Sequence, residues 1–156
     1  MLINMLFIVK NSHVIQMKPR KAVLPHDTES IESLLKYIDL SIYPECGDIE
    51  NPDDQWFVYE EELGIVGCVA SRRSTGEIRH IVVLPDYRKR DIGRQLANSA
   101  IEFLGKLGYS RIWGQIRVDN RESQQLFESL GFKCDHKPIT SRKNPEVKLY
   151  KYVLLL

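Results

Sequence analysis

The stretch that decides the fold is residues 83–94, which read VLPDYRKRDIGR. It begins at the end of a β-branched run over residues 77–84, and Pro85 stops that strand because proline has no N–H for a ladder. An amphipathic helix begins at Ile92, so the turn before it opens a helix whose first N–H groups have no partner. Four cations surround that helix start: Arg88, Lys89, Arg90 and Arg94. Unpaired amides, the helix dipole and these cations together predict a pyrophosphate-binding turn, and a charged, solvated turn is the alternative.

Outward from this turn, the pattern predicts strands and helices in a mixed order. The expected elements are a strand over residues 19–23, a helix over 28–38, strands over 55–60, 63–71 and 77–84, a helix over 92–107, a strand over 111–118, a helix over 120–130, and strand-like pieces around 132–136 and 147–155. Residues 41–54 are expected to form a loop. A three-strand meander followed by alternating helices and strands is typical of an α+β (mixed α/β) sheet with helices packed on it.

Composition limits the possible functions. With 156 residues the chain is expected to form one domain, over residues 17–156. A net charge of +1 argues against a dedicated nucleic-acid binder, and no apolar run is long enough to span a membrane. Cys46, Cys68 and Cys134 have neither disulfide nor metal-ligand spacing, which predicts a reducing cytoplasm and no metal. Residues 1–16 are interpreted either as an N-terminal extension with an extra strand or as the product of an upstream start, with Met17 as the natural one.

Two motifs carry a resemblance to a known family. The turn Arg88-Lys89-Arg90-Asp91-Ile92-Gly93 resembles the acetyl-CoA motif of the GNAT superfamily of N-acetyltransferases. The segment from Asn120 through Leu126-Phe127 to Gly131-Phe132 resembles the second GNAT motif, in the expected order. The resemblance implies a central, twisted, mostly antiparallel sheet of about six or seven strands, flanked by about three or four helices and splayed between its fourth and fifth strands. It also implies acetyl-CoA as cosubstrate and acetyl transfer to a primary amine by direct attack in a ternary complex.

The resemblance further implies which residues hold the coenzyme. The strand backbone at Ile81, Val82 and Val83 would pair with the pantetheine arm, and the Val83 N–H would polarise the thioester carbonyl. The amides of the turn would hold the pyrophosphate: Arg88, Lys89, Arg90, Asp91, Ile92, Gly93 and Arg94. Asn120 and Phe127 would lie on the pantetheine side.

Two residues depart from the family pattern. Asp91 stands where the family has glycine, and it brings a side chain and a negative charge toward an anion. Phe127 stands where many members have a tyrosine that protonates the leaving thiolate. Tyr150 and Tyr152 are substitutes in the last predicted strand. Alternatively, the thiolate leaves unprotonated, because a thiol pKa near ~8.5 makes it a fair leaving group.

The acceptor amine needs a base, and two residues are candidates. Glu77 lies eleven residues before Arg88, a spacing that resembles a catalytic glutamate in the histone-acetyltransferase branch of the family. His80 has the more suitable pKa, but strand alternation turns it away from Glu77 and Arg79 unless a bulge intervenes.

The acceptor itself is predicted only by charge. Residues 44–63 contain eight acids and no base, which suggests a rim that attracts a cationic small molecule or a peptide amine. The apolar end, residues 153–156, is a candidate homodimer contact. The alternative function is a catalytically weak regulatory module that binds acyl-CoA without turnover. No nucleic-acid or membrane partner is expected.

Overall fold

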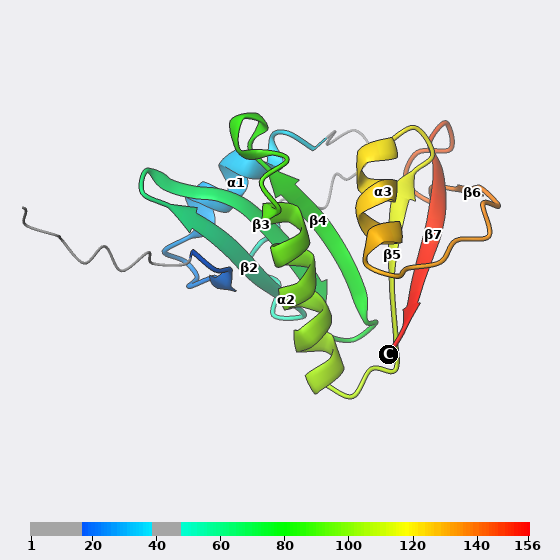
Figure 1. Ribbon diagram of the computed structural model, residues 1–156, viewed down its shortest axis with the longest axis horizontal. Helices are drawn as coiled ribbons and strands as arrows, with labels where there is room; N and C mark the ends of the chain where they lie inside the picture. Colours follow the sequence, from blue (N-terminus) through cyan, green and yellow to red (C-terminus); the bar gives the residue numbers. More distant parts are fainter. Residues whose placement is uncertain (1–16, 39–47) are drawn as a thin grey trace, which may run out of the picture.

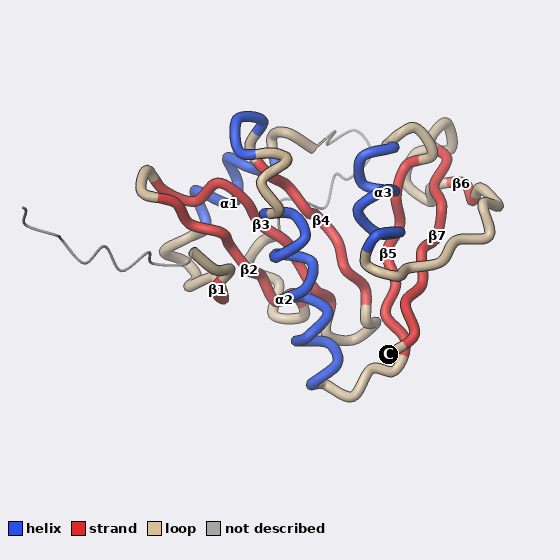
Figure 2. Tube along the Cα trace, viewed as in Figure 1, coloured by secondary structure: helices blue, strands red, loops and turns tan. Residues whose placement is uncertain are grey.

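The computed structural model describes residues 17–38 and 48–156, and within them the chain forms one seven-stranded sheet with helices on both faces (Figures 1 and 2). The strand order is β1-β2-β3-β4-β5-β7-β6. The strands are β1 (Arg20–Lys21), β2 (Asp54–Glu61), β3 (Gly64–Arg72), β4 (Glu77–Val83), β5 (Arg111–Arg117), β6 (Ile139–Thr140) and β7 (Lys148–Leu155). The helices are α1 (Thr28–Leu35), α2 (Ile92–Lys106) and α3 (Arg121–Ser129), with a short 3-10 turn at Pro85–Tyr87. This arrangement confirms the predicted α+β class.

The sheet opens between its fourth and fifth strands. β2, β3 and β4 form an antiparallel meander, and β5 pairs antiparallel with β7. Among the described residues β4 and β5 share only one register pair, Glu77 with Trp113, and that pair is parallel. Beyond it the two strands diverge toward their C-terminal ends, as Figure 1 shows. The predicted splay is confirmed, and it leaves one backbone edge of β4 without a neighbouring strand.

Apolar side chains on the two faces of the sheet build two cores. On one face, Ile31 and Leu34 of α1 pack against Trp56, Val58 and other residues of β2 to β4. On the opposite face α2 and α3 share a core whose buried members include Ile78, Leu96, Ile112, Phe127 and Tyr152. One helix therefore packs on one face of the sheet and two on the other, and no described helix packs on the α1 side of β5 and β7.

The boundaries near the C-terminus differ from the expected ones. Residues 132–136 form no strand and contribute a single bridge, Lys133 with Val153, while β6 lies further on at Ile139–Thr140. The predicted end of α3 holds, because Gly131 has a φ of +92° that a side chain would strain. The expectations for residues 1–16, and for Cys46 and Glu45, lie outside the described residues.

Candidate active site

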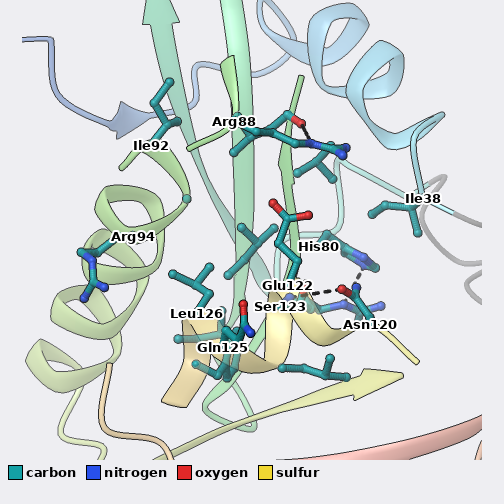
Figure 3. Close-up of a pocket in the computed structure, with 18 of the residues that line it drawn as sticks. Ile38, His80, Arg88, Ile92, Arg94, Asn120, Glu122, Ser123, Gln125 and Leu126 are labelled. Carbon is teal, nitrogen blue, oxygen red and sulfur yellow. Dashed lines mark hydrogen bonds between the residues drawn. The ribbon is translucent and has the colours of Figure 1, made fainter. Parts of the chain in front are cut away.

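A cleft of about 870 Å³ occupies the opening between β4 and β5. It runs from the start of α2, along the free edge of β4 and the flank of α3, to Glu77 at the base of the opening. Figure 3 shows its walls, with Arg88, Ile92 and Arg94 on one side and Glu122, Ser123 and Gln125 on the other. The predicted residues that line it are Glu77, His80, Ile81, Val82, Val83, Arg88, Lys89, Asp91, Ile92, Gly93, Arg94, Asn120 and Phe127. Arg90 does not line it; its guanidinium stacks 5.0 Å from the centre of the Tyr87 ring.

The backbone of β4 presents polar groups to the cleft. Leu84 N donates to Val66 O at 2.9 Å, so Leu84 faces β3. Because adjacent residues of a strand direct their backbone groups to opposite sides, Val83 directs its N–H and C=O toward the opening. Arg88 Nε donates to Val83 O at 2.9 Å, which agrees with that direction. The edge can therefore offer donors and acceptors to an extended ligand arm.

The turn before α2 shows how the backbone accommodates Asp91 and which cation pairs with its carboxylate. Asp91 adopts the left-handed conformation, with a φ of +66°, that the family's glycine would adopt without strain. Arg94 Nε donates to Asp91 Oδ1 at 3.1 Å, and Arg94 Nη2 donates to Ser129 Oγ of α3 at 2.9 Å. The carboxylate is thus matched by a guanidinium that is itself fixed to α3. With Arg88 and Lys89 beside it, the start of α2 fits a pyrophosphate.

A bulge in the β3–β4 ladder decides where His80 points. The register shifts between Cys68 and Ala70, and His80 has a φ of +57°. Its ring stacks on Trp56 of the α1-side core, with centroids 5.9 Å apart. His80 therefore faces the same side of the sheet as Arg79, whose Nε donates to His80 Nε2 at 2.8 Å. The bulge thus turns His80 to the side that simple strand alternation would have denied it, which is the exception that the sequence allowed.

The pKa values of the two candidate bases are shifted in opposite directions. Burial raises the pKa of Glu77, and the nearby Arg79 and Arg72 partly offset that rise. Burial lowers the pKa of His80 to about 3, with Arg79, Arg72 and Lys143 adding to the effect. His80 is therefore neutral at physiological pH, and its Nε2 lone pair already accepts from Arg79. The expectation that His80 has the more suitable pKa for a base is not met.

Phe127 closes the base of the opening with a purely apolar surface. Its ring packs against Phe132 and Tyr152, with centroids 4.6 and 5.9 Å away. Gly114 makes room for it, because a Cβ there would lie 2.8 Å from Phe127 Cε1 and 3.0 Å from Ile78 O. Asn120, the predicted cap, accepts from Ser123 N at 3.1 Å and fixes the start of α3.

The structure does not bring the tyrosines of β7 into the cleft. Tyr150 is half-buried and packs against the α3-side core; its ring lies next to His136, with centroids 5.4 Å apart, and it is not among the residues that line the opening. Tyr152 donates a hydrogen bond to Glu128 Oε1 at 3.1 Å. Burial, and to a smaller extent the Glu128 carboxylate, raise the pKa of Tyr152 to about 12. Strand alternation places both side chains on the α3 face. The structure thus places Tyr150, the predicted donor to the thiolate, outside the lining of the cleft.

The acids of residues 48–63, the described part of the predicted acidic rim, lie outside the lining of the cleft. Arg72 Nε binds Asp54 Oδ1 at 3.0 Å, Ser74 N donates to Asp53 Oδ1 at 2.9 Å, and Arg20 Nε donates to Glu60 Oε2 at 2.9 Å. Asp54, Asp53 and Glu60 therefore link neighbouring strands and turns through hydrogen bonds and ion pairs.

Several cleft residues were not predicted. Tyr37 and Ile38 follow α1, and Gln115 and Arg117 lie on β5. The signal for the last two was present: Ile112, Gly114 and Ile116 alternate with polar or amphipathic residues along residues 111–117, which places Gln115 and Arg117 on the opposite face.

The described residues contain neither a candidate metal site nor a candidate membrane-spanning helix. Residues 17–38 and 48–156 contain no group of histidine, cysteine, aspartate or glutamate side chains that could hold a metal ion. Over the same ranges no helix has the length and apolar character needed to cross a membrane.

Comparisons with known proteins agree with this geometry. The family model described as "Acetyltransferase (GNAT) family" matches residues 23–132. The chain is 32% identical over 93 residues to an uncharacterized N-acetyltransferase of Methanocaldococcus jannaschii, a match that covers 54% of this chain and 41% of that protein. It is 40% identical over 53 residues to the [ribosomal protein bS18]-alanine N-acetyltransferase of Escherichia coli K12, covering 34% of this chain and 36% of that protein. The chain thus spans less than half the length of these relatives.

A solved structure extends the agreement in fold. A Bacillus subtilis acetyltransferase in complex with CoA superimposes with a TM-score of 0.70 at 18% identity, covering 90% of this chain and 99% of that one. At this identity the match shows the fold alone.

Proposed function

Because the chain belongs to the acetyltransferase (GNAT) family, we propose that it is an acyltransferase that moves an acetyl group from acetyl-CoA to a primary amine by direct attack in a ternary complex. One observation carries the proposal. A single cleft joins an anion-binding helix start to a desolvated carboxylate at the base of the opening between β4 and β5. Donor and acceptor would meet in that opening without a covalent enzyme intermediate.

The coenzyme end of the cleft offers three kinds of contact. The first amides of α2 and the cations Arg88 and Lys89 suit the pyrophosphate. The exposed edge of β4 at Ile81 and Val83 suits the amides of the pantetheine arm. The Val83 N–H, directed into the opening, would polarise the thioester carbonyl, the role of an oxyanion hole.

We assign Glu77 as the base. Burial raises the pKa of Glu77, which makes its carboxylate a stronger base than an exposed one. In the reaction the amine nitrogen bonds to the acetyl carbon as the carbon–sulfur bond breaks. The proton leaves the nitrogen for Glu77, directly or through a water molecule, and the sulfur leaves as thiolate and takes a proton from solvent. Phe127 offers no proton for that last step.

His80 has a positioning role in this scheme. Its neutral ring, stacked on Trp56, accepts a hydrogen bond from Arg79 and holds that guanidinium beside Glu77. We place the activity in the cytoplasm, a reducing compartment that suits cysteines such as Cys134, which forms no disulfide among the described residues.

The test is acetyl transfer by the purified chain to a panel of amines, with Glu77→Gln as the variant and Glu50→Gln, an exposed acid outside the cleft lining, as the control. Loss of a general base typically lowers kcat by about 10²–10⁴-fold. We expect that loss for Glu77→Gln with an unchanged Kd for acetyl-CoA, and wild-type rates for Glu50→Gln. Binding of acetyl-CoA without transfer to any amine would instead establish the alternative, a regulatory acyl-CoA-binding module, which the apolar Phe127 favours.

A further inference from the structure

The α1-side face of β5 and β7 carries basic and apolar side chains that no described helix covers. Register pairs place Trp113 beside Val153, and Val153 beside Lys133. The neighbouring rows pair Gln115 with Lys151 and Arg111 with Leu155. Partners across antiparallel strands project to the same side, so these side chains share one face. We call Arg111, Trp113, Lys133, Lys151, Val153 and Leu155 the basic face.

The charge on this face is uncompensated. No carboxylate of the described residues forms an ion pair with Arg111, Lys133 or Lys151, and all three side chains are exposed. Lys151 Nζ lies 4.5 Å from the centre of the Trp113 ring, an electron-rich surface and not an anion. The whole chain has a net charge of only +1, so the three cations are a local excess.

The basic face also has an apolar recess. Arg111, Gly131, Lys133, Val153 and Leu155 line a second hollow of about 570 Å³, and Leu155 is 74% exposed. Cations that border an apolar hollow match a polypeptide that alternates acidic and apolar side chains. A nucleic acid would use the cations but has no aliphatic side chain for the hollow.

The basic face is continuous with the acceptor end of the cleft. Gln115 lines the cleft, and its register partner Lys151 belongs to the basic face. From Gln115 to Arg111 the strand advances four residues, or roughly 13 Å, a length that four residues of extended peptide also cover. An acceptor whose amine enters beside Glu77 can therefore lay its next few residues over this face.

We propose that the acceptor is a polypeptide with acidic and apolar residues within about four positions of its reactive amine, held by the basic face. The inference rests on the proposed function and names its substrate class. Exposed cations of this kind act mainly on encounter and on KM, because they lie away from the reacting atoms.

The experiment compares short peptides with a free N-terminal amine and one lysine, in three versions of the neighbouring residues. These are acidic (Asp and Glu), uncharged (Asn and Gln) and basic (Lys blocked by dimethylation). The variant Lys133→Glu/Lys151→Glu reverses two charges on the basic face. Lys18→Glu/Lys106→Glu makes the same change at exposed lysines on β1's side of the sheet and on α2.

We expect the wild type to use the acidic peptide with a kcat/KM about tenfold above the uncharged one, mostly through KM, with the difference shrinking as salt rises. The basic-face variant should remove that preference, and the Lys18 and Lys106 variant should retain it. Equal kcat/KM for the three peptides would overturn the inference while leaving the proposed function intact. So would a preference that both double variants lose alike.

Four further measurements keep the outcomes separate. If no peptide is acetylated, binding of fluorescent peptides in the presence of CoA decides. Selective binding of the acidic peptide that Lys133→Glu/Lys151→Glu abolishes supports the inference even where the proposed function fails. A single-stranded RNA that displaces the acidic peptide, or spermidine as the better acceptor, overturns it. A dimer in light scattering that the basic-face variant dissociates also overturns it, because the face would then be a contact between copies.

Discussion

Removing the charge of Asp91 is expected to tighten the binding of acetyl-CoA. Two unit charges 4 Å apart interact by about 1 kcal/mol in water and about 4 kcal/mol at an effective dielectric near 20. Asp91 is 60% exposed and is paired with Arg94, so the low end applies. A relief of about 1 kcal/mol corresponds to about a fivefold lower Kd for Asp91→Asn.

The variant Asp91→Asn isolates the charge, because asparagine tolerates the left-handed backbone that Asp91 adopts at a φ of +66°. Asp91→Gly removes the side chain as well and restores the residue typical of the family. Asp86→Asn is the control, since Asp86 lies in the preceding 3-10 turn and does not line the cleft. The control should leave the Kd within about twofold of the wild type.

Isothermal titration with acetyl-CoA at low and high salt measures these changes, and thermal unfolding provides a second readout. At saturating ligand a fivefold lower Kd adds about 1 kcal/mol and roughly 2–4 °C to Tm. The advantage of both Asp91 variants should decrease as salt rises. An unchanged or weaker Kd for both variants would refute the reasoning, because the carboxylate would then not act on the coenzyme phosphates.

The remaining predictions concern stability and pH. Gly114→Ala should lower the free energy of unfolding by about 1–3 kcal/mol and Tm by roughly 2–4 °C per kcal/mol, because the new Cβ would meet the Phe127 ring and the Ile78 carbonyl oxygen. An unchanged Tm in calorimetry would contradict this prediction. The pKa of His80 is lower in the folded than in the unfolded chain, so stability in urea should fall as pH drops from about 6.5 toward 3, the unfolded chain binding the proton first. Arg79→Ala should raise the pKa of His80 in NMR titration, which an unmoved pKa would dispute. Asp27→Asn should lower the free energy of unfolding by about 1–3 kcal/mol, since Arg20 would lose the buried one of its two carboxylate partners and keep only the exposed Glu60; equal urea midpoints would count against it.

The sequence predicted the site best where chemistry is local. The start of α2 and the cap at Asn120 follow from neighbouring residues, and both lie where the motifs place them. The orientation of His80 could not be predicted, because it depends on a bulge set by the register of β3 against β4. The pairing of Arg72 with Asp54 depends on antiparallel register in the same way, and it takes that acid away from the predicted rim.

The charges at the acceptor end connect the two proposals. Arg79, Arg72 and Lys143 all lower the pKa values of Glu77 and His80, so these cations contribute positive potential at this end of the cleft, where Asp54 opposes them. A positive potential disfavours an ammonium ion and favours the neutral amine, which is the form that attacks. The same potential would repel a bare cationic amine before it reached Glu77. An acceptor with carboxylates beside its amine escapes that repulsion, because its acids bind the basic face while its amine loses a proton in the cleft. Two sets of cations would therefore act together. Those of the basic face would select an acidic polypeptide, while Arg72, Arg79 and Lys143 would favour the neutral form of its amine.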